Sequence, residues 1–442
     1  MNHNHSSQSD HQSRFWRLAI VNILSNLMVP LASLVDVAFL GHLTEIRHLA
    51  GVAIATILFN YIYWTFGFLR MGTTGLTAQA MGRNEADQVI LTLLRNGAIA
   101  LTLGIIILIL QQPIREIGFR LLKADSGVIE AGRTYYNALI WGAPATLLNF
   151  VLLGWFLGKE QGKKVFLFSL VNSGANVFFD YLYIVQWGQK SAGAGTATAI
   201  SQYTTLLLCL IMVGREIPWS SLRHNFKNII NISAFKATFS LNRDILIRTL
   251  ALISTFAIFT NLSATMGTMV LTANTLLLQV VTLAAYFIDG IAFATESIAG
   301  NLQGQGQDKQ LMPLLKLAGG SSLLAGLGFA IAFALFTQPL FSLLTSHSEV
   351  VKLVGNYVWW LLPILGFGSM AYMLDGYFLG LTAGKILRQS TLIATLFGFA
   401  PMAIAAWYTH KSHLLWLALA LFMAARSITL GLEVRRRFSR IH

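Results

Sequence analysis

Several polar residues inside apolar stretches have the types and spacing of a site for a small cation. Asp36 follows Pro30 by six residues within one apolar run, and Asp180 follows Asn176 by one helical turn within another. Thr196, Thr198 and Ser201 lie in the next run, at a similar depth. Carboxylate, amide and hydroxyl oxygens suit a proton or Na⁺, so we predict that these side chains form a cation-coupling site. The alternative is that Asp36 and Asp180 are unrelated structural acids.

A second set of ionisable residues lies in the apolar runs of the C-terminal half. Asp289 and Glu296 are seven residues apart and therefore share one face of a helix. Asp375 lies near the end of a later run, and Arg248, at the start of an earlier one, could neutralise one of these acids. Arg426 is expected to reach the membrane interface or to pair close to it. Ionisable groups in spans mark functional sites by default, but a salt-bridged structural network fits this set as well as a coupling site does.

The composition requires that the runs carrying these residues lie in a membrane. Of 442 residues, 55% are hydrophobic and 11% are charged, against about 25% charged in soluble proteins. The formal net charge is +13, but the basic residues lie almost entirely between apolar runs, so we expect no nucleic-acid partner. A single cysteine, Cys209, allows no intramolecular disulfide. We expect no cofactor, and no metal other than Na⁺ at the coupling site, where H⁺ or Na⁺ is the coupling ion.

Twelve apolar runs are each long enough to cross a membrane, whose core of about 30 Å takes about 20 helical residues. The runs begin near Trp16, Leu49, Ile90, Tyr135, Val165, Gly193, Ile245, Thr272, Leu314, Val351, Ile386 and His413. An even number of spans places both termini on one side of the membrane. With the termini in the cytoplasm, most Lys and Arg residues of the loops lie on the cytoplasmic side, so we predict cytoplasmic termini in the cell membrane.

The chain consists of two related halves of six spans each. The motif GWFLG at residues 154–158 recurs 222 residues later as GYFLG at residues 376–380, and Gln112-Pro113 recurs as Gln338-Pro339. Because six spans separate the copies, both halves cross the membrane in the same sense. We predict an all-α polytopic fold of two six-helix bundles related by a pseudo-two-fold axis.

These boundaries divide the chain into five segments. We expect a disordered cytoplasmic tail (1–13), an N-terminal six-helix bundle (14–213), a cytoplasmic linker (214–242), a C-terminal six-helix bundle (243–434) and a basic cytoplasmic tail (435–442). Pro30 removes a backbone donor from the first span, so we expect a hinge at this residue.

Several of these segments resemble the MATE (multidrug and toxic compound extrusion) family of transporters. The run PLASLVDVAFLGH at residues 30–42 is similar to the span 1 signature of that family, and residues 286–296 resemble its DinF-type branch. Residues 176–181 and 192–198 fit its spans 5 and 6. The resemblance covers nearly the whole chain. It implies two bundles that export cationic or amphipathic compounds in exchange for H⁺ or Na⁺.

The resemblance also implies where coupling takes place. The cation site of the DinF-type branch falls on Asp36, Asn176, Asp180 and Thr198. A different branch places a cation-linked acid pair on spans 7 and 10, but span 7 here, residues 250–266, carries no acid, and Asp375 alone does not restore the pair. The resemblance therefore favours coupling through the N-terminal half.

We expect a monomeric cation-coupled antiporter that exports small cationic or amphipathic compounds by alternating access, with membrane lipids as its other partners. The sequence shows no catalytic triad, nucleotide-binding loop or metal motif, so we expect no enzymatic activity and transport that is driven by an ion gradient. One alternative is a flippase for a lipid-linked substrate, whose cavity should carry several cationic residues. A channel or receptor is disfavoured because paired halves serve alternating access.

Overall fold

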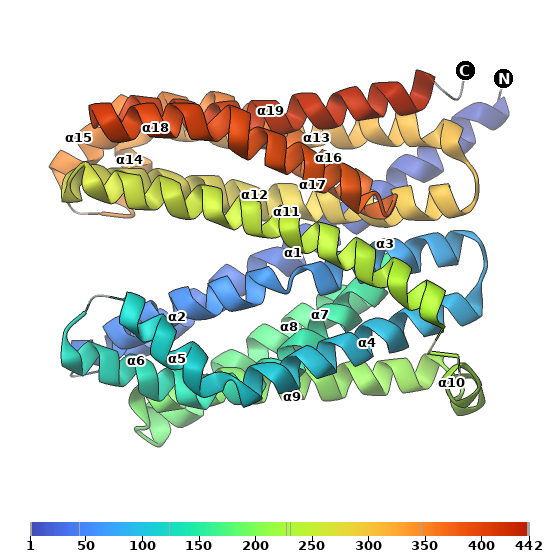
Figure 1. Cartoon of the computed structure of the whole chain (residues 1–442), viewed down its shortest axis with the longest axis horizontal. Helices are drawn as coiled ribbons and strands as arrows, with labels where there is room; N and C mark the ends of the chain where they lie inside the picture. Colours follow the sequence, from blue (N-terminus) through green and yellow to red (C-terminus); the bar gives the residue numbers. More distant parts are fainter. Residues whose placement is uncertain are drawn as a thin grey trace. The chain divides into compact units, whose positions relative to one another are not determined.

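A computed structural model describes residues 2–43, 45–122, 124–226, 228–229, 231–345 and 347–439 of the chain. Within these residues the regular structure is entirely helical (Figure 1), and twelve helical segments are long and apolar enough to span a membrane. They are Gln12–Gly41, Ile46–Gly82, Ala86–Ile109, Ser126–Gly158, Gly162–Gln186, Lys190–Glu216, Ser233–Thr265, Thr268–Gly304, Asp308–Leu335, Ser348–Gly380, Gly384–Thr409 and Ser412–Ser439. Each segment contains the start expected from the sequence, so the prediction of twelve spans is confirmed.

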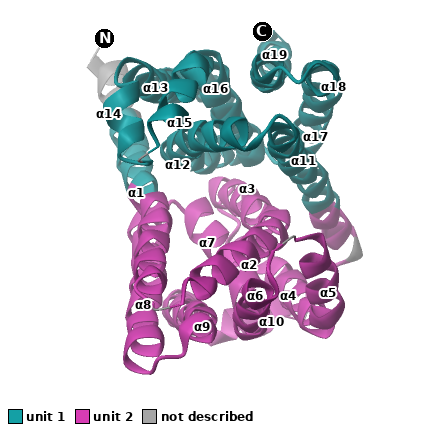
Figure 2. Ribbon diagram, turned by 90° about the vertical axis from the view of Figure 1, so that its left-hand side faces the viewer, with its two compact units in different colours: residues 1–23, 240–442 teal, residues 24–239 magenta. Residues whose placement is uncertain are grey.

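The chain divides into two compact units (Figure 2). Unit 2 consists of residues 24–239, and unit 1 consists of residues 1–23 and 240–442. The first 23 residues therefore belong to the same unit as the C-terminal half, whereas the sequence placed the whole first span in the N-terminal bundle. Gly290 permits this packing, because a Cβ atom there would lie 2.6 Å from the backbone nitrogen of Ile23.

The first helix, α1, runs from Asn2 to Gly41 and has Pro30 in its interior. Residues 2–13, which the sequence analysis above expects to be a disordered tail, are thus the first turns of this helix. None of the residues before Pro30 is a glycine or a proline, so no residue interrupts the backbone hydrogen bonds upstream of the apolar run.

Unit 2 contains the second half of α1 and nine further α-helices. They are α2 (Ile46–Thr65), α3 (Phe68–Gly82), α4 (Ala86–Ile109), α5 (Gln111–Leu121), α6 (Ser126–Leu139), α7 (Ala143–Gly158), α8 (Gly162–Asp180), α9 (Lys190–Glu216) and α10 (Trp219–Phe226). Three residues of 3₁₀-helix, 140–142, join α6 to α7, and a π-helical turn, 181–186, extends α8.

Unit 1 repeats this plan with its own set of helices. They are α11 (Ile232–Thr265), α12 (Thr268–Gly304), α13 (Leu311–Leu335), α14 (Thr337–Ser342), α15 (Ser348–Tyr357), α16 (Leu361–Gly380), α17 (Gly384–Ile393), α18 (Ala400–Thr409) and α19 (Ser412–Ser439). A 3₁₀ segment, 358–360, joins α15 to α16, and a π-helical turn, 394–399, joins α17 to α18. The expected linker, 214–242, is largely helical, since α10 and the start of α11 lie within it.

The repeated glycine motif holds two helices together at the same place in each unit. A Cβ atom at Gly154 of α7 would lie 2.4 Å from the carbonyl oxygen of Arg70 in α3. A Cβ atom at Gly376 of α16 would lie 2.4 Å from the carbonyl oxygen of Ala292 in α12. Only glycine allows backbones to approach this closely, which explains why the motif recurs in the sequence.

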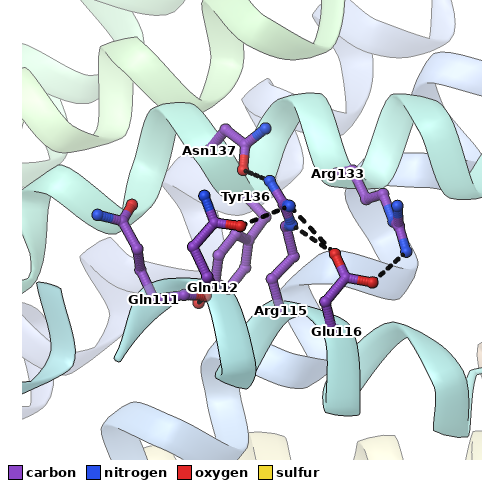
Figure 3. A network of polar contacts seen from close by, with 7 residues as sticks. All are labelled: Gln111, Gln112, Arg115, Glu116, Arg133, Tyr136 and Asn137. Carbon is purple, nitrogen blue, oxygen red and sulfur yellow. Dashed lines mark hydrogen bonds and ion pairs between the residues drawn. The ribbon is translucent and has the colours of Figure 1, made fainter. Parts of the chain in front are cut away.

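A polar network at one end of unit 2 joins α5 to α6 (Figure 3). The Arg115 guanidinium donates to Oδ1 of Asn137 over 2.9 Å and to the Glu116 carboxylate, which also accepts from Arg133 over 2.9 Å. The hydroxyl of Tyr136 donates to a backbone carbonyl of α5 over 3.0 Å. The hydrogen bond from Arg115 is the main reason why the pKa of Glu116 lies below its usual range.

Candidate functional site

A cavity of about 460 Å³ in unit 2 brings together residues from α1, α2, α6, α8 and α9. Three of the four residues predicted for the coupling site, Asp36, Asn176 and Thr198, line it. The residues around the cavity, all within the described part of the chain, include no Lys, Arg or Glu. Asp36 is therefore the one acidic group that the cavity presents to a molecule inside it.

The fourth predicted residue, Asp180, lies directly against Asp36. Their carboxyl groups are in contact, and Asp180 is only 1% exposed. Both carboxyl oxygens of Asp180 and one of Asp36 are buried and accept no hydrogen bond from any described residue. Two carboxylates in contact and away from water repel each other. Ionisation of both carboxyl groups at once is therefore unfavourable in this arrangement.

Asn176 and Thr198 hold neighbouring positions of the same site. The Asn176 side-chain amide donates to Oγ1 of Thr198 over 3.3 Å, and this hydroxyl in turn donates to the carbonyl oxygen of Ala194 over 3.0 Å. Asn176 lies one turn before Asp180 on α8, so both side chains share one helix face. The structure thus places all four residues predicted from the sequence in one region of unit 2.

The cavity has further polar lining residues that the sequence did not single out. They include Asn172 and Gln202, whose amides extend the site along α8 and α9, and Tyr135 of α6. Asn172 lies one turn before Asn176, and Gln202 lies one turn after Thr198, so helical spacing was a usable signal for both. An aromatic residue in an apolar run is usually part of the hydrophobic core, so the sequence did not indicate that Tyr135 lines a cavity.

In unit 1, Asp375 is enclosed by two arginines from other helices. Its carboxylate accepts hydrogen bonds from Arg248 of α11 and from Arg426 of α19. All three side chains are buried. The sequence suggested that Arg248 could neutralise one of the acids in this half, and in the structure it pairs with Asp375. Arg426, expected near the membrane interface, is fully buried and pairs with the same carboxylate.

Asp289 and Glu296 both belong to α12 but lie in different surroundings. Glu296 is fully buried on the stretch of helix against which α16 packs through Gly380. Asp289 is half-buried, and its charge acts on the Tyr372 phenol together with the charges of the Asp375 cluster. Of these three acids, Asp375 is the one whose carboxylate pairs with two buried arginines.

Comparisons with known proteins cover almost the whole chain. A family model described as MatE matches residues 22–182 and 245–404. DNA damage-inducible protein F of Escherichia coli K12 is 33% identical over 426 residues, which make up 96% of this chain and 92% of that protein. The probable multidrug resistance protein NorM of Photorhabdus laumondii is 24% identical over 94% of each chain.

Solved structures share the fold at lower sequence identity. An outward-facing structure of a multidrug resistance MATE family transporter matches with a TM-score of 0.85 and 20% identity, over 97% of this chain and 96% of that one. A mutant of the Vibrio cholerae MATE transporter VcmN matches with a TM-score of 0.86 and 17% identity, over 98% of each chain. The all-helical fold of twelve spans is therefore that of these transporters.

Proposed function

The chain belongs to the MatE family of multidrug efflux transporters, and we propose that it is an antiporter that exchanges H⁺ or Na⁺ for small cationic or amphipathic compounds. One observation carries this proposal. The Asp36 and Asp180 carboxyl groups touch each other, and both oxygens of Asp180 and one of Asp36 have no hydrogen-bond donor among the described residues. Because Asp36 also faces a cavity of about 460 Å³, a volume typical of small-molecule sites, an ion and a substrate meet at the same carboxylate.

Charge competition at Asp36 links the two transported species. With the coupling cation bound, the acid pair carries one negative charge less, and the cavity holds a cationic substrate more weakly. With the substrate's positive group beside Asp36, the pair holds the coupling cation weakly. Such mutual weakening is reciprocal by thermodynamic necessity, and it is the property that an antiporter requires. Asn176 and Thr198 supply an amide and a hydroxyl oxygen as further ligands if the ion is Na⁺.

Pro30 is a hinge in α1 through which a charge change at Asp36 can alter the cavity. It cannot donate the hydrogen bond that other interior helix residues make, so α1 has a weak point six residues before Asp36. We propose that α1 bends at Pro30 when the charge of Asp36 changes, which moves the wall of the cavity that α1 forms.

A proteoliposome assay tests antiport and identifies the ion. Purified protein is reconstituted with a fluorescent organic cation such as ethidium, and a pH gradient or a Na⁺ gradient is imposed separately. We expect uphill movement of the dye on one of the two gradients, with counterflow of that ion. Dye movement at the same rate with neither gradient, or none on either, would overturn the proposal.

The cavity favours this function over a lipid-linked substrate flippase. A flippase has to neutralise phosphate groups during transfer, and arginine or lysine side chains do this best. The residues that line the described cavity include neither. A cavity whose charge comes from a carboxylate suits a positively charged substrate instead.

The proposed direction of export requires both chain ends in the cytoplasm. The basic residues of the loops support this orientation through the positive-inside rule. Single cysteines at Gln189 and at Ser439, in a background with Cys209→Ala, test it in intact cells. We expect a membrane-impermeant maleimide to label the first position and not the second, and the reverse pattern would invert the topology.

A further inference from the structure

Unit 1 has a cavity of its own, which shares no lining residue with the cavity of unit 2 described above. It is a groove of about 590 Å³ formed by α13, α16 and α19, which lie along one side of unit 1 in Figure 2. Its lining is apolar except for Lys316 and Ser427, and the lining residues, all described, include no acid. We call this cavity the α13–α19 groove.

Glycines keep the walls of the α13–α19 groove open, and methionines form its floor. A Cβ atom at Gly320 of α13 or at Gly431 of α19 would meet no heavy atom within 4 Å. Between these walls, the terminal methyl groups of Met370 and Met373 of α16 come within 3.4 Å of a Cβ position at Gly319. Methionine side chains adjust to irregular apolar shapes, so this floor can follow a hydrocarbon chain.

Lys316 supplies one positive charge near the end of this apolar groove. The span Asp308–Leu335 has 28 residues and is about 42 Å long at 1.5 Å per residue, which exceeds the bilayer core of about 30 Å. Lys316 therefore lies close to the core boundary, within reach of the lipid phosphates through its long side chain. It is exposed.

We propose that the α13–α19 groove binds an anionic phospholipid of the surrounding bilayer, with one acyl chain along Met370 and Met373 and the phosphate on Lys316. Charge complementarity selects this occupant. The groove combines an apolar lining with a single cation, Lys316, about one turn from Met312 at one end of the lining on α13. The apolar lining complements an acyl chain and the cation complements a phosphate. A juxtamembrane cation contributes about 1 kcal/mol to the binding of anionic lipid, so the preference over zwitterionic lipid should be several-fold.

Native mass spectrometry of the full-length protein in detergent tests the groove. The protein is titrated with phosphatidylglycerol or with phosphatidylethanolamine of identical acyl chains, and lipid adducts are counted. We expect wild type to retain one phosphatidylglycerol about five-fold more tightly than phosphatidylethanolamine, by the size of the charge contribution. Lys316→Gln should remove this preference and leave binding of the acyl chain intact.

A pair of glycine variants on α13 separates groove binding from binding elsewhere. Gly320→Leu places a side chain inside the groove, whereas Gly328→Leu places one in open space outside its lining. Both remove an exposed helical glycine, so their effects on folding should match, which thermal melting verifies. We expect Gly320→Leu to lose the bound lipid and Gly328→Leu to behave like wild type.

Two results would overturn the proposal. One is retention of phosphatidylglycerol by Gly320→Leu as tightly as by wild type, which would place the lipid outside the groove. The other is a dimer without lipid adducts that Gly320→Leu disperses, which would show that a second copy of the chain occupies the groove. Transport activity is not used as a readout, so failure here leaves the antiport proposal standing.

Discussion

The negative charges of buried acids have different surroundings in the two units. Asp180 of unit 2 is 1% exposed, lies against another acid, Asp36, and accepts no hydrogen bond from any described residue. Asp375 of unit 1 is 4% exposed and accepts hydrogen bonds from two buried arginines, Arg248 and Arg426. A guanidinium is a fixed cation that stays with the protein, whereas the described lining of the cavity at Asp36 includes no Lys or Arg. This difference supports the proposal that the acid pair of unit 2 serves coupling and that Asp375 serves structure.

The internal repeat shows that each chemistry belongs to one half only. At the repeat offset of 222 residues, Asn176, Asp180 and Thr198 fall on Gly398, Met402 and Ala420. Asp375 and Arg426 in turn fall on Leu153 and Thr204. The glycine packing motif, by contrast, is present in both halves. The shared scaffold is therefore retained while the buried charges are not.

The largest expected effect is the loss of transport in Asp36→Asn. The variant keeps the side-chain shape but removes the charge for which ion and substrate compete, so gradient-driven efflux from proteoliposomes should fall to the level of protein-free vesicles. Asp289→Asn is the matched control in the other unit and should retain most of the activity. Uphill efflux by Asp36→Asn, or equal loss in Asp289→Asn at equal reconstitution, would break the contrast between the units.

The next largest effect is the loss of stability in Asp375→Asn. Removing this charge leaves two buried guanidinium groups without a counter-charge, which costs about 3–5 kcal/mol. A thermal melt in detergent should therefore show a clearly lower midpoint than wild type. A double variant with Arg248→Gln should recover part of the loss, because it removes one of the two uncompensated charges.

Asp180→Asn makes the same chemical change in unit 2 and should behave differently. It replaces a carboxylate that has no donor with a neutral amide, so its melting midpoint should equal or exceed that of wild type while transport is lost. A midpoint as low as that of Asp375→Asn would show that both acids are structural.

The sequence predicted the twelve spans because a lipid environment forces long apolar runs, and this prediction is confirmed. It also singled out Asp36 and Asp180, since each is an acid inside such a run, and their coupling role stays a prediction. The partners of Asp375 were harder to predict, because Arg248 and Arg426 come from spans far apart in the chain. Which face of each span turns toward its neighbours depends on packing, which no local pattern records.

A smaller effect is expected for the neutral ligands of the site. Thr198→Val keeps the shape of the side chain but removes a hydroxyl that accepts from Asn176. A hydrogen bond between neutral groups contributes about 0.5–1.5 kcal/mol, so the coupling-ion concentration for half-maximal efflux should rise about two- to ten-fold. Thr204→Val is the control, since its hydroxyl bonds the α9 backbone and does not line the cavity. Equal shifts in both variants would mean a general effect on α9.

The smallest effect concerns an exposed acid, Glu116, whose arginine partners resemble those of Asp375. Because its pKa lies below the usual range in the folded protein, the ionised carboxylate stabilises the fold above the unfolded-state pKa of about 4.3. That contribution is lost as the pH falls through the lower folded-state pKa. Glu116→Gln should therefore melt slightly below wild type at pH 7, and the gap should close below about pH 4.

Salt distinguishes this exposed network from the buried one. The Glu116 and Arg133 side chains are 37% and 40% exposed, so added NaCl should screen their attraction and shrink the gap between wild type and Glu116→Gln at pH 7. The loss of stability in Asp375→Asn should be insensitive to the same salt, because water and ions do not reach a buried cluster. A gap for Glu116→Gln that stays constant in pH and salt would mean that the side chain acts through packing. In that case the number of arginines around an acid would not predict how much the acid stabilises the fold. The burial of the ion pair would predict it instead.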